Sequence, residues 1–220
     1  MRSFAVFGAS GCGRGVMPLV RDQLRVDDQL PVDLVFVDDA PPAPEVNGQR
    51  VLSYREWLSI PADERWVTIA IADSRVREEI ARRCSRDGVR FLDVRASNTV
   101  VMDDVQLGNG AILSPFVTLT SNVTIGVHFH ANLYSYVEHD CVIGNFVTFA
   151  PAVHCNGNVV VEDHAYIGAG AVIRQGRPGA PLVIGRGATV GMGAVVTRSV
   201  PPGATVVGNP ARPLIRPSAT

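Results

Sequence analysis

The chain has 220 residues, with 20 basic and 21 acidic side chains and a formal net charge of −1. A charge this close to zero gives no electrostatic indication of binding to nucleic acid or an anionic membrane. No stretch approaches the roughly 18 apolar residues of a membrane span, and the start lacks the pattern of a signal peptide. We therefore expect no nucleic-acid partner, no membrane insertion and a cytoplasmic location.

Charged residues divide the chain near residue 100. Residues 1–100 hold 29 of the 41 charged side chains, although they make up less than half of the length. The first part therefore has the composition of an ordinary α/β domain, and the second that of a neutral solenoid. A chain of this length is long enough for two small domains. We place them at residues 1–98 and 99–220.

The first domain alternates short apolar segments with helical ones. Strands are expected at residues 3–7, 32–37, 66–72 and 91–94, with helices after the glycines of residues 8–15 and after Asp73-Ser74. The second helix should bury Val76, Ile80 and Cys84 and end at Gly88. Strands that alternate with helices imply a parallel, Rossmann-like sheet.

Glycines and acidic residues follow the first two predicted strands. The segment from Gly8 to Gly15 has the spacing G-x-x-G-x-G instead of the dinucleotide fingerprint G-x-G-x-x-G, so NAD binding is not supported. Such glycines either let backbone N–H groups approach a phosphate or only shape a tight turn. Asp38 and Asp39 lie where such folds hold a ribose or base, or they are solvated loop charges. Taken together, the two features favour a nucleotide.

The second domain repeats with a period of six residues. Thirteen consecutive blocks open with a mostly large apolar residue: Val101, Leu107, Leu113, Leu119, Ile125, Ala131, Val137, Ile143, Phe149, Cys155, Val161, Ile167 and Ile173. The fifth residue of each block is usually small or branched. This pattern predicts a left-handed parallel β-helix, in which three short strands close a coil of eighteen residues and coils stack about 4.8 Å apart. About five extra residues in 174–183 predict a loop at one corner.

The histidines and cysteines of this domain do not predict a metal site or a disulfide. Eighteen residues per coil place His128 and His164 on either side of Phe146, about 9.6 Å apart. One zinc ion, which needs each nitrogen at about 2.1 Å, cannot bind both. Two of the four cysteines, Cys141 and Cys155, fall on inward positions, where a free thiol acts as a small hydrophobic group.

His139 lies at an outward position between Glu138 and Asp140. The two carboxylates favour the charged form of the imidazole, and one of them can fix its tautomer. Such a histidine is suited to general-base catalysis, although a histidine on an inert surface can have the same neighbours.

Three segments together resemble the sialic-acid O-acetyltransferase-like sugar acyltransferases, and among them the bacterial N-acetyltransferases of UDP-linked 4-amino sugars. They are GASGCGRG at the start, VDD after the second strand and EHDCVIGNF within the coils. The resemblance extends from Phe4 to the VGNPA segment at residues 207–211, and EHDC is its most specific element.

The resemblance implies that His139 is the general base and that Asp140 orients it. It also implies a homotrimer that binds acetyl-CoA between adjacent subunits, and the spacing of the histidines gives no reason to expect a metal. The implied nucleotide-sugar-binding residues are Ser10, Gly11, Cys12, Asp38, Asp39 and Ala72, and the implied acetyl-CoA-binding residues are Thr148, Ala169 and Met192. Cys12 stands where a histidine is common in the family, and Thr148 stands where some members have a histidine.

The resulting hypothesis is an acetyl-CoA-dependent N-acetyltransferase that acts on a nucleotide-linked amino sugar in polysaccharide biosynthesis. We expect direct transfer, because the repeat points Cys141 into the core and leaves no accessible thiol nucleophile. The alternatives are an O-acetyltransferase of a sugar hydroxyl and a non-catalytic trimer that binds a nucleotide sugar. The arginines Arg174 and Arg177 in the predicted loop are either surface charges or contacts to the phosphates of CoA.

Overall fold

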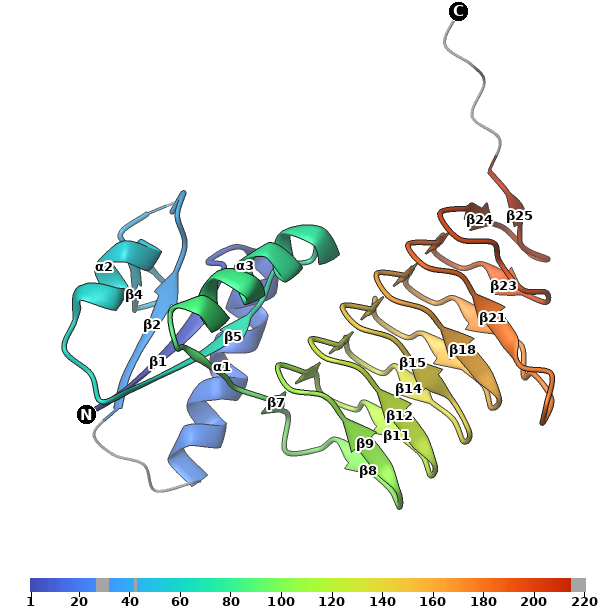
Figure 1. Ribbon diagram of the computed structural model, residues 1–220, viewed down its shortest axis with the longest axis horizontal. Coiled ribbons are helices and arrows are strands. Elements are labelled where there is room, and N and C mark those ends of the chain that lie inside the picture. The colour runs from blue at the N-terminus through green and yellow to red at the C-terminus, as the bar shows by residue number, and fades with distance from the viewer. Residues whose placement is uncertain (27–31, 42, 215–220) are drawn as a thin grey trace, which may run out of the picture. The chain divides into compact units, whose positions relative to one another are not determined.

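The computed structural model describes residues 1–26, 32–41 and 43–214. The chain forms two compact units, which Figure 1 shows as an α/β unit and a stack of coils. The first unit comprises Met1–Ser97 and Asn109–Ser114, and the second comprises Asn98–Gly108 and Pro115–Thr220. Within the described residues, no helix is both long and apolar enough to span a membrane.

The first unit is built on a six-stranded sheet with the order β3-β4-β2-β1-β5-β6. All neighbours pair in parallel except β3 and β4, which form an antiparallel hairpin. The strands are β1 (Arg2–Phe7), β2 (Val32–Val37), β3 (Glu45–Val46), β4 (Gln49–Leu52), β5 (Glu64–Ile69) and β6 (Arg90–Phe91), and the helices are α1 (Gly11–Val26), α2 (Tyr54–Ser59) and α3 (Ser74–Arg86). The parallel pairing agrees with the alternation of strands and helices in the sequence.

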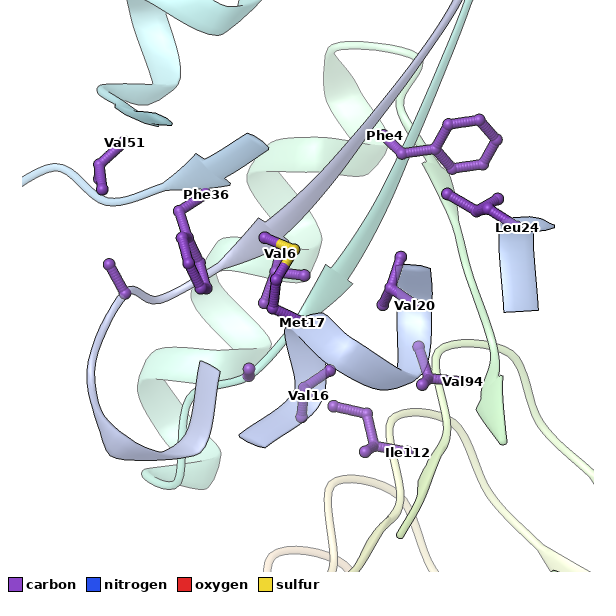
Figure 2. Close-up of a cluster of buried hydrophobic side chains, with 12 residues drawn as sticks. Phe4, Val6, Val16, Met17, Val20, Leu24, Phe36, Val51, Val94 and Ile112 are labelled. Atoms are coloured by element: carbon purple, nitrogen blue, oxygen red, sulfur yellow. The ribbon is translucent and has the colours of Figure 1, made fainter. Parts of the chain in front are cut away.

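Helices cover both faces of the sheet. Successive side chains of β1 point to opposite sides, so the strand packs against a helix on each face. Phe4 and Val6 pack in one hydrophobic cluster with Met17 of α1, as Figure 2 shows. On the other face, Ser3 Oγ accepts a 2.8 Å hydrogen bond from Nε1 of Trp57 in α2, and both side chains are fully buried. The central strand is therefore enclosed by apolar layers.

Two predicted strands of this unit have different bounds in the structure. β5 runs over Glu64–Ile69 and not over 66–72, because its pairing with β1 ends at Phe7 and Ile69. The predicted strand at 91–94 is divided into β6 and β7 (Val94–Arg95), and β7 pairs with β10 (Ile112–Leu113) instead of joining the six-stranded sheet. The sequence pattern also did not predict α2 and β4.

Helix α3 begins as predicted, but its buried face is different. The Asp73 side chain caps the helix by accepting hydrogen bonds from two backbone N–H groups of the first turn. Ile80 and Cys84 are buried as predicted, whereas Val76 is 44% exposed and Arg77 is fully buried. The Arg77 guanidinium donates to two carbonyl oxygens at the end of β5, and this pairing makes the inward position favourable for an arginine.

The second unit is a parallel β-helix with three sheets. One sheet contains β13 (His130–Ala131), β16 (Thr148–Phe149), β19 (Tyr166–Ile167), β22 (Thr189–Val190), β24 (Thr205–Val207) and β25 (Arg212–Pro213), of which only β25 is antiparallel to its neighbour. The second contains β8 (Val100–Val101), β11 (Thr118–Leu119), β14 (Tyr136–Val137), β17 (His154–Cys155), β20 (Val172–Ile173) and β23 (Val195–Val196). The third contains β9 (Val105–Leu107), β12 (Val123–Ile125), β15 (Val142–Ile143), β18 (Val159–Val161) and β21 (Leu182–Ile184).

The register of the strands confirms the predicted coil and loop. Thr118 pairs with Tyr136, and Tyr136 pairs with His154, so each coil has eighteen residues. Val172 pairs with Val195, and the five extra residues lie in the predicted loop. The residues that open the blocks are buried from Leu113 to Ile173, whereas Val101 is 38% exposed in the first coil of this unit.

Candidate active site

His139 and Asp140 lie at a corner of the β-helix, two and three residues after the end of β14. Corner residues recur every sixth position with φ in the left-handed region, and Asp140 has φ of 59°. His139 Nδ1 lies 2.8 Å from Asp140 Oδ2. Because an ionised carboxylate can only accept, the hydrogen must reside on Nδ1, and in the neutral imidazole Nε2 carries the lone pair. The structure thus brings this predicted pair into direct contact.

The electrostatics of this pair suit a base that is accessible to substrates. The His139 side chain is 43% exposed. Its hydrogen bond to Asp140 raises the pKa of His139 above the ordinary value of 6.5. A raised pKa strengthens the imidazole as a proton acceptor, at the cost of a smaller neutral fraction near pH 7.

Three polar or aromatic side chains of this coil and the next contact one another and were not predicted from the sequence. Tyr136 Oη donates a 2.9 Å hydrogen bond to Asn156 Oδ1, and the Tyr136 ring stacks on His154 with centroids 4.9 Å apart. His154 follows Tyr136 by eighteen residues, and Gly157 follows His139 by the same interval. The coil length was therefore the signal that could have identified these neighbours.

Cys141 follows the pair in the sequence but points inward, as predicted. It is 1% exposed, and its Sγ lies 3.3 Å from the carbonyl oxygen of Asn156 and 3.4 Å from the backbone nitrogen of Val159. A hydrogen bond from Cys155 lowers the pKa of the Cys141 thiol. The lowered pKa does not make Cys141 a nucleophile, because a buried thiol cannot reach a substrate.

The predicted nucleotide-binding residues lie at the carboxyl ends of β1, β2 and β5 in the first unit. Helix α1 begins at Gly11, so the glycine segment is partly helical and does not precede the helix as predicted. Asp38 connects two of these strand ends, because its Oδ2 accepts a 3.0 Å hydrogen bond from the Ala9 backbone. Ser10 and Gly11 are exposed at the start of α1, where N–H groups favour anions.

Close packing explains one glycine of this segment. A Cβ at Gly13 would lie 1.8 Å from the carbonyl oxygen of Gly8, so any side chain there would separate the helix from the strand. The glycines therefore have at least one structural role, which the sequence alone left open.

Asp39 is held by the protein's own residues. One carboxylate oxygen accepts from the backbone N–H of Tyr54 at 3.0 Å, and the other is 2.8 Å from Nη2 of Arg83. The Arg83 guanidinium also lies over the Tyr54 ring, 4.4 Å from its centroid. Asp39 thereby connects β2 to α2 and α3 at this edge of the sheet.

Cys12 and Ala72 lie near a buried arginine that sequence reasoning missed. Nη1 of Arg77 donates to the carbonyl oxygens of Ile71 and Ala72, at 2.7 and 3.2 Å. Burial lowers the pKa of Arg77 to about 10, so the guanidinium stays charged at neutral pH. Burial also raises the pKa of the Cys12 thiol, which therefore stays neutral. The sequence did not indicate this burial, because an arginine on a helix is usually exposed.

The structure brings together two of the three predicted acetyl-CoA-binding residues. Ala169 and Met192 occupy equivalent positions in successive coils, where the N–H of Gly193 donates to the Ala169 carbonyl at 2.8 Å. Met192 is 81% exposed. Thr148 instead lies buried on β16, the neighbour of β19. Within the part of the chain that the structure describes, no group of three or more His, Cys, Asp or Glu side chains could hold a metal ion.

A β-helix with an exposed histidine–carboxylate pair, in a chain that also carries a parallel α/β unit, defines an acyltransferase of the left-handed β-helix class. No family model matches the chain. It is 49% identical over 216 residues to the GDP-perosamine N-acetyltransferase of Escherichia coli O157:H7, and the match covers 98% of each chain. The chain therefore belongs to the sugar acyltransferase family.

Solved structures show the same similarity along the whole chain. WeeI from Acinetobacter baumannii AYE is 56% identical with a TM-score of 0.94, and the match covers 97% of this chain and 100% of WeeI. PerB from Caulobacter crescentus, in complex with CoA and GDP-perosamine, is 26% identical with a TM-score of 0.81, over 96% of this chain and 97% of PerB.

Proposed function

We propose that this acyltransferase moves the acetyl group of acetyl-CoA to the amine of a nucleotide-linked amino sugar, with His139 as the general base. One observation carries the proposal: Nδ1 of His139 is engaged by Asp140 at 2.8 Å, and the side chain is 43% exposed. Nε2 is therefore left as the proton acceptor of a partly exposed ring. The 49% identity to a GDP-perosamine N-acetyltransferase supports an amine acceptor.

The geometry supports direct transfer without a covalent enzyme intermediate. Amines with a pKa near 8 are mostly protonated at pH 7 and need a base to attack. His139 Nε2 takes a proton from the amine as its nitrogen attacks the thioester carbonyl. The new C–N bond replaces the C–S bond, and the protonated His139 returns its proton to the departing sulfur, which leaves as the CoA thiol. Asp140 stabilises the imidazolium that forms.

The first unit is proposed as a Rossmann-like nucleotide-binding domain of residues 1–98, with residues 99–220 as the acyltransferase domain. Residues 27–31, 42 and 215–220 of these ranges lie outside the described structure. The start of α1, with Ser10, Gly11 and Cys12, would face the diphosphate, and Ala72 would close the pocket. Asp38 and Asp39 lie at the adjacent strand end, and both hold backbone N–H groups. The PerB complex with GDP-perosamine favours GDP as the nucleotide.

A homotrimer is proposed, with acetyl-CoA bound between adjacent subunits along Thr148, Ala169 and Met192. Met192 is 81% exposed in the single chain, so its side chain is accessible to a ligand or a neighbouring subunit. A solved PglB acetyltransferase domain from Neisseria gonorrhoeae FA1090 is described in complex with acetyl coenzyme A.

A substrate panel tests the proposal. Purified protein is offered acetyl-CoA with GDP-, UDP- and dTDP-linked amino sugars and with the corresponding hydroxy sugars, while thiol release and product mass are followed. We expect turnover of a GDP-linked amino sugar and a loss of about 10²–10⁴-fold in kcat for His139→Asn, the usual contribution of a general base. Unchanged turnover in this variant would overturn the role of His139, and turnover of hydroxy sugars alone would indicate an O-acetyltransferase.

A further inference from the structure

We infer that Gly157, held in place by the loop of residues 174–181, positions the imidazole of His139. The inference rests on the proposed function, because it takes His139 as the catalytic base. According to this inference, the extra loop supports the active site of its own chain. Glycine is required at position 157 for the reaction and not for folding.

The imidazole packs directly on the backbone of Gly157. A Cβ at this position would lie 2.5 Å from Cε1, 2.6 Å from Nε2 and 3.0 Å from Cδ2 of His139. All three of the nearest atoms belong to the ring. Carbon atoms in favourable contact are about 3.5–4.0 Å apart, so a methyl group and this ring cannot occupy their places together. Gly157 therefore forms one wall of the imidazole site, and Asp140 anchors the ring at Nδ1.

The wall itself is held from two sides by backbone hydrogen bonds. From below, the carbonyl of His139 accepts from the N–H of Asn158 at 3.0 Å. From the inserted loop, Gly176 N–H donates to the Gly157 carbonyl at 2.9 Å, and from β21, which follows the loop, Leu182 N–H donates to the Asn158 carbonyl at 3.2 Å. The loop thus closes over the coil at the point where the imidazole packs. The loop therefore has a structural role that does not require its two arginines, Arg174 and Arg177, to bind a ligand.

Gly157 lacks the features that make other glycines essential for folding. It is not among the residues with positive φ, so alanine is compatible with its backbone. The atoms that an added methyl group would meet belong to a half-exposed side chain, which can rotate away without disturbing the coil. Gly157→Ala should therefore fold, and the ring should leave Asp140.

The first test compares Gly157→Ala with Gly187→Ala. Gly187 has φ of 65° and open space around its Cβ, so alanine there strains the backbone without touching His139. We expect Gly157→Ala to lower kcat by about 10²-fold or more, close to the effect of losing the base, with little change in KM for either substrate. Gly187→Ala should lower the melting temperature and leave kcat nearly unchanged. Wild-type kcat in Gly157→Ala would overturn the inference.

The second test reads the imidazole itself and does not depend on turnover. An NMR titration of the His139 ring should give a lower pKa in Gly157→Ala, because the hydrogen bond to Asp140 that raises it is broken. In a His139→Ala background, Gly157→Ala meets no ring and should not lower the melting temperature. A His139 pKa equal to that of the wild type would overturn the positioning role. If His139→Asn keeps full turnover while the titration shifts as expected, the proposed function fails and the packing inference stands.

Discussion

The buried thiol of Cys141 provides a direct test of how the acetyl group moves. Cys141→Ala removes an Sγ that lies 3.3 Å from the Asn156 carbonyl and 3.4 Å from the Val159 nitrogen. The variant leaves a buried N–H without its weak partner and a gap of about one atom, so we expect a loss of about 1–2 kcal/mol in the free energy of unfolding. His139 and Asp140 make their contact without this sulfur. In direct transfer, kcat should therefore change by less than about tenfold, or about 1.4 kcal/mol of barrier.

Urea denaturation and steady-state kinetics measure both quantities in the same preparation. Ser135→Ala is the matched control, because Ser135 occupies the equivalent buried position one block earlier and its Oγ accepts from the Val153 N–H as the Cys141 Sγ accepts from Val159. Mass spectrometry of the protein mixed with acetyl-CoA, without an acceptor, should show no acetylated species. A stoichiometric acetyl-enzyme that disappears in Cys141→Ala, together with a kcat loss of several orders of magnitude, would refute the reasoning and establish a covalent route through Cys141.

Two further predictions concern the pH dependence and the core. Asp140→Asn removes the group that raises the pKa of His139, so the acid limb of the kcat/KM profile should move to lower pH and its plateau should fall. Asp104→Asn, two coils earlier at the same corner, is the control and should leave the profile unchanged. Because the folded-state pKa is raised, the contribution of His139 to stability is present below its ordinary pKa and is lost as the pH rises through the raised value; denaturation at several pH values should show this slope only with Asp140 present. Ser3→Ala should cost about 1–3 kcal/mol in the free energy of unfolding and leave kcat unchanged, because it strands the buried N–H of Trp57; a negligible cost in urea denaturation would contradict the importance of this bond.

The solenoid and the orientation of its site residues could be predicted from the sequence alone. Every coil uses the same positions of a six-residue block, so the local pattern decides which side chains point inward. Cys141 is inside and His139 is outside, as the repeat predicts. The five extra residues before Ile184 likewise predict the loop, because the coils on either side of it must stay in register.

Contacts between residues far apart in the sequence were decided only by the tertiary structure. The end of β5 depends on the length of β1, and the inward turn of Arg77 depends on the carbonyl oxygens beside it. Asp39 is held by Arg83, which comes from a different element. The coil length makes Gly157 a neighbour of His139, but only the structure shows that the imidazole packs in the space that a side chain of residue 157 would occupy. Local periodicity therefore determined where the site lies, and three-dimensional packing determined what holds its base in place.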